Sequence, residues 1–450
     1  LDVQLTGGDF KLFGGRVAGT IKKERHDHYL SASYDQSAGY KYNTDYKLLN
    51  FFYQGGVNIG AGRLKLIAGV TDRSFGANGF YASPDFMDQY EEITTGLGAL
   101  SFSTLIKEKA VLESRLYYRT NHDEYIFIRE NPDFYRNNHV NNTLGFEVNS
   151  TIPSKLGLTG IGVDINQVNL TSNNLGDHDR FVATLFLEQR FSLINDKLSI
   201  TPGVQLNSYS DFGFVALPGL DMGYAISDRF TVFGSIGETY RVPTFTDLYY
   251  IDPVNTGNPD LQPEYAWTYE VGLKSTRLPG FIIQSSVFYR DGHDNIDWVR
   301  ETDTDPWTPV NVREVVMTGF DNNFSFMLDQ ITGRSNAFVK RLDLNYTFID
   351  SEISGADSQL SRYALENLRH QFMAGLHLHY FGHINHSIMF SYNDRVNLDD
   401  YSLLDTRIAW EQNKYSIFVD VTNIFDVEYQ ETNLVTMPGR WAKMGVRFSL

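Results

Sequence analysis

Four histidines near the C-terminal end are the first residues whose spacing suggests chemistry. His377 and His379 are two residues apart, so a strand would place both imidazoles on one face, and His383 and His386 follow closely. Two imidazoles on one face can bind a transition metal, but cysteine, a common further ligand, is absent from all 450 residues. We therefore interpret these histidines as structural side chains and predict no metal site.

Motifs for catalysis are missing as well. The glycine-rich stretch GGVNIGAG (55–62) lacks the Lys-Ser/Thr pair that follows in a phosphate-binding loop. The chain contains neither a G-x-S-x-G nucleophile elbow nor an H-E-x-x-H metalloprotease motif. We therefore predict that the protein is not an enzyme and has no catalytic residues.

Aromatic and amide side chains gather in three segments that are rich in turn-forming residues. The stretch SFGANGFYASPDFMDQYEE (74–92) contains the candidate binding residues Asn78, Phe80, Tyr81, Ser83 and Pro84. Further candidates from 123–139 and 241–264 are Tyr125, Tyr135, Tyr249, Tyr250 and Asn258. Aromatic faces with a few hydrogen-bonding tips suit a broad and partly apolar ligand. The alternative is that each ring only packs its own loop.

Composition narrows the class of protein. The chain is 42% hydrophobic, and its 27 Tyr and 32 Phe indicate long strands or interfacial belts. A net charge of −17 argues against a nucleic-acid partner, which requires a basic surface. No window of 18 apolar residues occurs, yet the mean hydropathy of −0.30 is compatible with a membrane β-barrel. The first residues, LDVQLTGG, lack the features of a signal peptide, so we expect a mature chain or a fragment.

The elements that must position these loops are strands. RLDLNYTFI places Leu342, Leu344, Tyr346 and Phe348 on one face and polar side chains on the other. KYSIFVDV repeats this alternation, and no amphipathic helix of three turns is evident. Such patterning over most of the chain predicts an all-β protein.

The connections between the predicted strands fall into two kinds. Short links rich in Gly, Asn, Asp and Pro occur at 24–27, 58–62, 153–157, 194–197, 227–229, 277–280, 381–384 and 412–414. Long aromatic and acidic loops alternate with them at 74–90, 122–138, 241–264, 292–313, 351–367 and 426–437. This asymmetry and a count of about 22 strands predict an antiparallel transmembrane β-barrel with short periplasmic turns and long extracellular loops. A soluble propeller or sandwich is the alternative, but no blade repeat or domain linker is present.

One of these long loops carries a recognisable motif. The stretch GETYRVPTFTDLYYIDPVNTGNPDLQPEYAWTYEVGLK (237–274) resembles the signature region of TonB-dependent outer-membrane receptors. Its matching residues are Arg241, Pro243, Gly257, Pro259, Leu261, Pro263 and Glu264. Proline fixes φ and glycine tolerates unusual backbone angles, so we expect a loop that is ordered before it meets a ligand.

The end of the chain resembles the same family. NIFDVEY followed by PGRW matches the last hairpin through Asn423, Phe425, Asp426, Tyr429, Pro438, Gly439 and Arg440. The final KMGVRFSL (443–450), with Phe448 and Leu450 on one face, resembles the signal by which such barrels are recognised for insertion. The resemblance implies a barrel over residues 1–450 in a Gram-negative outer membrane, in contact with bilayer and lipopolysaccharide.

The resemblance also implies parts that these 450 residues do not contain. Family members carry an N-terminal plug domain and a short motif that the inner-membrane protein TonB grips, whereas this sequence starts with what we interpret as the first barrel strand. We expect TonB and its energising complex as partners through that plug. A surface lipoprotein that caps the long loops is a further expected partner.

The expected ligand follows from the loop at 74–92, which looks like the corresponding loop of vitamin B12 (cobalamin) receptors. We therefore predict import of cobalamin or a related corrinoid. A ferric-siderophore receptor, a haem receptor using His122, His139 or His293, and a passive pore remain alternatives. Cobalamin receptors order their loops around calcium with several aspartates, but the loop here has only Asp35 and Asp45. We therefore expect no cofactor and doubt a need for calcium.

Overall fold

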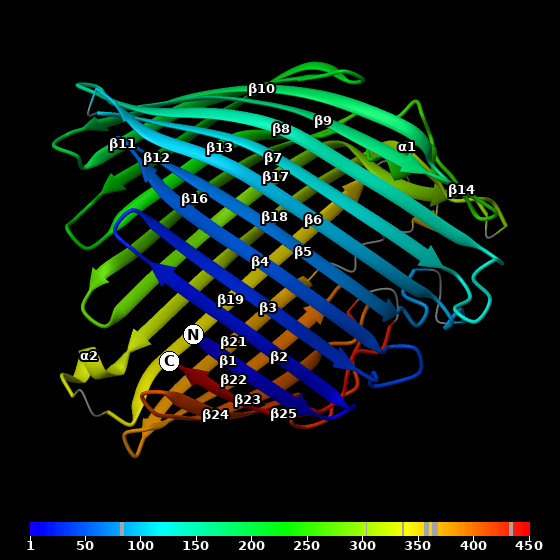
Figure 1. Cartoon of the computed structure of the whole chain (residues 1–450). Helices are drawn as coiled ribbons and strands as arrows, with labels where there is room; N and C mark the ends of the chain where they lie inside the picture. Colours follow the sequence, from blue (N-terminus) through cyan, green and yellow to red (C-terminus); the bar gives the residue numbers. More distant parts are fainter. Residues whose placement is uncertain are drawn as a thin grey trace.

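A single antiparallel sheet closes on itself to form the barrel in Figure 1. The computed structural model describes residues 1–81, 85–107, 109–302, 304–334, 337–354, 360–361, 368–431 and 435–450. Within those ranges the closed barrel has 22 strands, and almost no helix is present. The predicted fold class is therefore confirmed.

The strands of the first half are β1 (Asp2–Gly8), β2 (Leu12–Lys22), β3 (His26–Ser37), β4 (Tyr46–Ile59), β5 (Gly62–Gly76), β6 (Tyr90–Ile106), β7 (Ala110–Ile126), β8 (Arg136–Ser154), β9 (Gly157–Ser172), β10 (Gly176–Leu193) and β11 (Leu198–Tyr209). Those of the second half are β12 (Gly213–Ala225), β13 (Thr231–Arg241), β16 (Glu264–Leu278), β17 (Phe281–Arg300), β18 (Thr308–Met327), β19 (Val339–Ser354), β21 (Leu368–Tyr380), β22 (Ile384–Arg395), β23 (Tyr401–Glu411), β24 (Tyr415–Thr422) and β25 (Trp441–Ser449). Smaller elements in the connections are α1 (Phe245–Tyr249), β14 (Ile251–Asp252), β15 (Asn255–Thr256), α2 (Leu328–Thr332) and β20 (Leu360–Ser361).

Each barrel strand pairs with the next one along the chain, and β1 closes the ring against β25. In that seam Val3 lies opposite Phe448, and the N-terminal amine donates to the Leu450 carbonyl at 3.0 Å. The two chain ends therefore meet, as the N and C labels in Figure 1 show. A closed ring leaves no unpaired sheet edge, which is what a β-structure in a bilayer requires.

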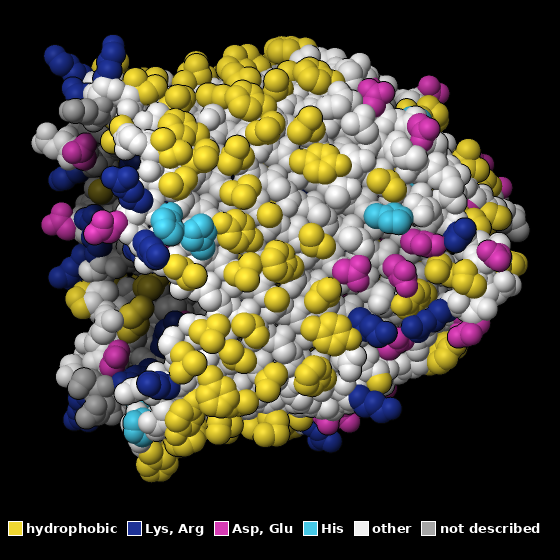
Figure 2. Space-filling view, viewed as in Figure 1, with side chains coloured by type: hydrophobic (Ala, Val, Ile, Leu, Met, Phe, Trp, Pro, Cys, Tyr) yellow, Lys and Arg dark blue, Asp and Glu magenta, His cyan; other side chains and the backbone are white. Residues whose placement is uncertain are grey.

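The predicted alternation gives the wall two different faces. Ile165 pairs with Phe146, and both residues are exposed on the outer surface. Asp164, the residue before Ile165, is on the other face of the sheet, where it lies opposite Glu147 and Thr184. Figure 2 shows the result, with apolar side chains spread over the outer wall between two rims that carry charged residues. The outer wall therefore has the apolar surface that lipid contact requires.

The two rims differ largely as predicted. The rim that holds both chain ends has short turns, including 60–61, 155–156 and 412–414, and its longest connection contains α2. The opposite rim has the long loops, among which 242–263, named here the signature loop, contains α1. Neither helix among the described residues is long and apolar enough to cross a membrane. Sequence patterns predicted the long and short loops but missed both five-residue helices.

Candidate ligand-binding site

Tyr81 lies in the connection between β5 and β6 at the long-loop rim. Its phenol donates a hydrogen bond to the Glu91 carboxylate, and its ring meets Tyr125 edge-on with centroids 5.4 Å apart. Phe80 packs edge-on against Tyr81 at 5.1 Å. Both rings keep about 40% of their surface exposed. Ser83 and Pro84, predicted on the same loop, lie outside the described residues.

A second pair of tyrosines continues this surface. The hydroxyls of Tyr135 and Tyr250 are 3.4 Å apart, and Asn137 Nδ2 donates to the Tyr250 hydroxyl at 3.4 Å. Asn174 Nδ2 donates to the Tyr135 hydroxyl at 3.3 Å and to the Ile251 carbonyl at 2.7 Å. The end of the β7–β8 hairpin and the signature loop are thereby joined.

We call Tyr81, Tyr125, Tyr135 and Tyr250 the tyrosine row. Tyr135 lies across its hairpin from Phe127, whose amide donates to the Tyr135 carbonyl at 3.1 Å, and Tyr125 lies two residues before Phe127, opposite Asn137. Burial raises the pKa of Tyr81, as it does the pKa of Tyr250, so both phenols stay neutral near pH 7. Neutral phenols offer apolar ring faces and hydrogen-bond donors together.

The signature loop is ordered by buried contacts. Thr244 caps α1 through a capping box with Asp247, whose other carboxylate oxygen accepts a hydrogen bond from Trp298 Nε1 at 3.1 Å. Leu261 is only 2% exposed. A Cβ on Gly257 would lie 2.8 Å from the Leu248 carbonyl oxygen, so the chain passes too close for a larger residue. These contacts place Tyr250 at the end of the tyrosine row.

The remaining signature residues brace the same loop. Arg241 donates to the Glu264 carboxylate, whose second oxygen accepts from the Ile296 amide at 2.6 Å. The carbonyl of buried Pro243 accepts from Arg180 Nη2 at 3.2 Å. Pro263 is buried as well, whereas Pro259 is exposed on the turn. The motif therefore acts mainly as internal support in this structure.

Three predicted binding residues have side chains engaged within the loops. Asn258 Nδ2 donates to the Pro309 carbonyl at 3.0 Å, and Asn78 Nδ2 donates to the Tyr42 carbonyl at 2.6 Å. Tyr249 stacks on His178 with centroids 3.7 Å apart and planes 8° apart. One ring face of Tyr249 is therefore covered. A ligand contact for these three residues stays a prediction.

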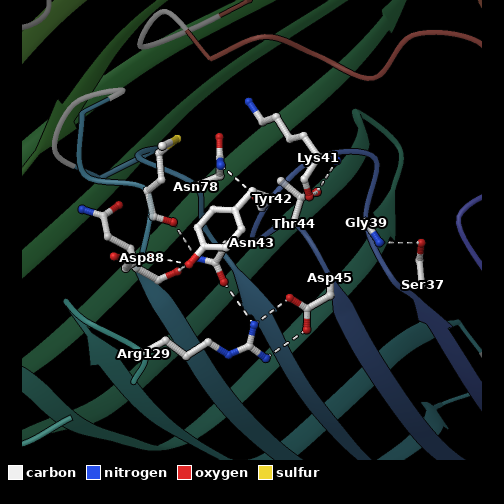
Figure 3. Close-up of polar contacts among 12 residues, drawn as sticks. Ser37, Gly39, Lys41, Tyr42, Asn43, Thr44, Asp45, Asn78, Asp88 and Arg129 are labelled. Atoms are coloured by element: carbon white, nitrogen blue, oxygen red, sulfur yellow. Dashed lines mark hydrogen bonds and ion pairs between the residues drawn. The ribbon is translucent and has the colours of Figure 1, made fainter. Parts of the chain in front are cut away.

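Figure 3 shows a polar network that the sequence did not reveal. Arg129, from the β7–β8 connection, forms a bidentate ion pair with Asp45 at 2.7 and 2.9 Å. It also donates to Asn43 Oδ1 at 3.1 Å. We call these three residues the Arg129 cluster. The sequence suggests Asp45 only as a calcium ligand, whereas in this structure its carboxylate binds a guanidinium.

The second family block closes the last long connection. Asn423 is buried and exchanges two 2.8 Å hydrogen bonds with the backbone of Val427. The Asp426 carboxylate accepts from the Arg440 amide at 2.6 Å, and a Cβ on Gly439 would collide with that carboxylate. Asn423 Nδ2 also donates to the Pro438 carbonyl at 3.4 Å.

Two aromatic residues of this second block behave differently. Tyr429 packs against Tyr401 with ring centroids 4.5 Å apart. Phe425, in contrast, is 70% exposed, and no described ring packs against it. The block is therefore a braced turn with one aromatic side chain left on the surface.

His377 and His379, two of the four histidines near the C-terminal end, have protein partners. His377 lies 3.0 Å from both the Asp343 carboxylate and the Ser387 hydroxyl, and His379 lies 2.8 Å from Asn385 Oδ1. Over the described ranges, no group of three or more His, Cys, Asp or Glu is arranged to hold a metal ion. A hollow of about 460 Å³ lies elsewhere, on the wall near the short-turn rim. It is lined by Arg190, Lys197, Lys274 and Arg277 among others, apart from the tyrosine row.

Several residues of the long-loop rim could not be predicted from the sequence. Asn43, Arg129, Asn137, Asn174 and Trp298 come from five separate segments, and none belongs to a family motif. Asn43 has a φ of 51°, a left-handed conformation that Asn tolerates in turns. An Asn in a loop can therefore suggest such a turn from its residue type. The partners of the other four depend on strand register, which the alternation pattern alone does not determine.

This chain is similar to a known family of proteins. The family model described as "TonB dependent receptor-like, beta-barrel" matches residues 8–424. The vitamin B12 transporter BtuB of Vibrio vulnificus (strain YJ016) is 29% identical over 283 residues, which is 60% of this chain and 43% of that protein. The vitamin B12 transporter BtuB of Photobacterium profundum is 27% identical over 225 residues, which is 47% and 34% of the two chains. The match therefore spans less than half the length of these curated relatives.

Solved structures show the same fold. The copper transporter OprC superposes with a TM-score of 0.82 at 14% identity, covering 100% of this chain and 80% of that one. A double mutant of the Serratia marcescens hemophore receptor HasR, in complex with its hemophore HasA and heme, gives 0.81 at 15%, covering 99% and 80%. At sequence identities this low, the similarity shows only that the fold is shared. Because the family model spans nearly the whole barrel, the chain belongs to the TonB-dependent receptor β-barrel family.

Proposed function

We propose that this protein captures cobalamin or a related corrinoid at the outer membrane and imports it with energy that TonB supplies. The observation that carries this proposal is the sequence match to two vitamin B12 transporters, over 60% and 47% of the chain. The match does not extend to the whole relatives, so substrate and activity are inferred for this chain.

The tyrosine row supports the choice of ligand. A corrinoid is broad, apolar on its faces and rimmed with amides, so it calls for flat aromatic contacts with a few hydrogen-bonding groups. Tyr81 of that row and the neighbouring Phe80 are partly exposed, on the loop that resembles cobalamin receptors. Loops that are braced in advance lose less conformational entropy on binding.

The rest of the transport cycle is proposed from the family. A plug domain with a TonB-binding motif would close the lumen and rearrange when TonB pulls on it. A surface lipoprotein is proposed to cover the long loops, and the apolar outer wall would contact bilayer and lipopolysaccharide. No resident cofactor is proposed.

Other ligands remain distinguishable candidates. Receptors for hemophore-bound heme share this fold, and haem would favour axial histidines. His122 and His293 are exposed at or near the long-loop rim, whereas His139 is half-buried and lies 2.8 Å from the Ser172 hydroxyl. A siderophore would use the same aromatic surface without such ligands.

Uptake in cells tests the proposal. Cells that lack their own corrinoid receptor and express the full-length protein should accumulate labelled cyanocobalamin, and a proton-gradient uncoupler should abolish that accumulation. Tyr81→Ala should reduce uptake at low ligand concentration by roughly tenfold, the effect of losing one well-placed aromatic contact. Phe381→Ala is the matched control because Phe381 is 87% exposed on the opposite rim. Uptake that persists with the uncoupler would indicate a passive pore, and no uptake at all would redirect the search to haem and siderophores.

A further inference from the structure

Arg129 lies where three loops of the long-loop rim meet. Its guanidinium forms the ion pair with Asp45 and the hydrogen bond to Asn43, both on loop 38–45, and it lies over the Tyr90 ring with 4.0 Å to the centroid. Its backbone amide donates to the Asp88 carbonyl at 2.9 Å, on loop 77–89. One residue of loop 127–135 therefore contacts both of the other loops.

Asn43 extends this contact. While its Oδ1 accepts from Arg129, its Nδ2 donates to the carbonyls of Met87 and Gln89 at 2.7 and 2.6 Å. The side chain is buried, and a φ of 51° turns it toward loop 77–89. A Cβ on Gly76 would lie 2.4 Å from both Asn43 oxygens, so the neighbouring strand is shaped to admit this amide. Figure 3 shows the amide between the guanidinium and loop 77–89.

The chain of contacts reaches the tyrosine row. The Gln89 carbonyl is held by Asn43, and the Gln89 side chain, which is fully buried, accepts a hydrogen bond from the Tyr81 amide at 3.2 Å. Asn78 and Tyr42 add a second tie, because Asn78 Nδ2 donates to the Tyr42 carbonyl while the Tyr42 hydroxyl donates to the Asp88 carboxylate at 2.5 Å. Loop 77–89 is therefore fastened at both of its ends.

The acceptors around the guanidinium are carboxylate and amide oxygens, the same atoms that bind a metal cation and order a loop around it. Three side-chain oxygens, two from Asp45 and one from Asn43, converge on one delocalised positive charge. Both ion-pair side chains are about one third exposed, at 34% and 35%, so the pair is partly shielded from water. A bidentate pair of this kind fixes direction as well as distance.

We propose that Arg129 is a positioning residue that fastens loops 38–45, 77–89 and 127–135 into one cooperative unit, and that it does so in place of a bound metal ion. A side chain of the protein then supplies the positive charge that orders the three loops, and the tyrosine row keeps its arrangement for that reason. This inference does not depend on the identity of the transported ligand.

Hydrogen exchange measured by mass spectrometry on the full-length receptor in detergent tests the proposal without any ligand. Arg129→Ala should speed exchange roughly tenfold in both loop 38–45 and loop 77–89, the factor expected from loss of a net charge-assisted hydrogen bond. Arg136→Ala is the matched control, because Arg136 is on the same rim and its ion pair with Glu124 at 3.3 Å joins only adjacent strands. Heat-modifiable gel migration verifies that each barrel has folded.

Rescue and chelation complete the test. Millimolar guanidinium chloride should slow exchange in Arg129→Ala relative to equal sodium chloride, because the ion can occupy the vacated site, and Arg129→Lys should be intermediate because it keeps charge but not the planar fork. EDTA should leave the wild-type loops unchanged. Unchanged exchange in loop 77–89 of Arg129→Ala, or faster exchange of the wild type in EDTA, would overturn the proposal.

Discussion

The Arg129 cluster and the signature loop both order long connections on the same rim, but by different physical means. The signature loop buries Leu261 to 2% exposure, and Asp247 in its capped helix α1 accepts a hydrogen bond from the buried Trp298. The Arg129 cluster consists of polar side chains and relies on an ion pair whose side chains are one third exposed. One region is stabilised mainly by burial and the other by directed polar bonds.

This difference predicts how each region responds to change. Burial is lost when volume is removed, whereas a polar network is lost when one partner is removed or its charge changes. We therefore expect the signature loop to be sensitive to truncation of apolar side chains and less affected by the loss of a single polar partner. The Arg129 cluster should show the reverse pattern.

Truncation of Leu261 should give the largest effect. Leu261→Ala removes a fully buried side chain and should lower the local opening free energy of the signature loop by about 2–5 kcal/mol. Exchange of the Gly257 and Asn258 amides, which bond to the Tyr250 and Asp247 carbonyls at 2.7 and 2.9 Å, reports that opening. Val254→Ala, in the same loop but 59% exposed, is the control. Equal effects of the two changes on these amides would contradict stabilisation of the signature loop by burial.

Removal of the Asn43 side chain should come next. Asn43→Gly keeps the positive φ but deletes the bonds to two loop carbonyls and to Arg129, at an expected cost of about 1–3 kcal/mol. The cost should appear as faster exchange in loop 77–89 and not in the signature loop. Asn397→Gly, an exposed Asn that also has positive φ, is the control. Spread of the effect to both loops would mean that the two regions are one unit.

Acid should weaken the Arg129 cluster by no more than about 1 kcal/mol, because the pair is partly exposed. The hydrogen bond from Arg129 holds the pKa of Asp45 below its usual value. A lowered carboxylate pKa contributes stability above its unfolded value, about 4, and that stability is lost as the pH falls through the folded pKa. Exchange in loop 38–45, corrected for intrinsic rates, should stay flat from pH 7 to 5 and rise below about 4. A rise already at pH 6 would contradict this assignment.

Loss of a single phenol should give the smallest effect. Tyr250→Phe removes two hydrogen bonds of 3.4 Å, so we expect no more than about 0.5–1 kcal/mol. Thermal melting in detergent, with Tyr224→Phe on the lipid-facing wall as control, measures it. A larger loss would show that the tyrosine row itself orders the signature loop.

Much of the fold could be predicted because strand alternation and turn chemistry are local signals. RLDLNYTFI predicted its strand within β19, and the turns at 194–197 and 412–414 fell on the short-turn rim. The signature loop could be located because its residues are contiguous. The five-residue helix α1 was missed because it is shorter than the window of about 11 to 18 residues in which a helical hydrophobic period can be recognised.

The Arg129 cluster could not be predicted from sequence patterns. Its members are separated by up to 86 positions, and each is an ordinary loop residue when considered alone. Only the register of β3 to β8 brings Asn43 and Arg129 together. The same dispersal hides the Arg129 guanidinium as the partner of Asp45.

The most direct test of the central claim is an equilibrium titration of cyanocobalamin into the purified full-length receptor, in calcium and in EDTA. We predict saturable one-to-one binding of equal affinity in both buffers, weakened roughly tenfold in Tyr81→Ala. Absence of cyanocobalamin binding, together with binding of haem or a ferric siderophore under the same conditions, would contradict the assignment of a corrinoid ligand.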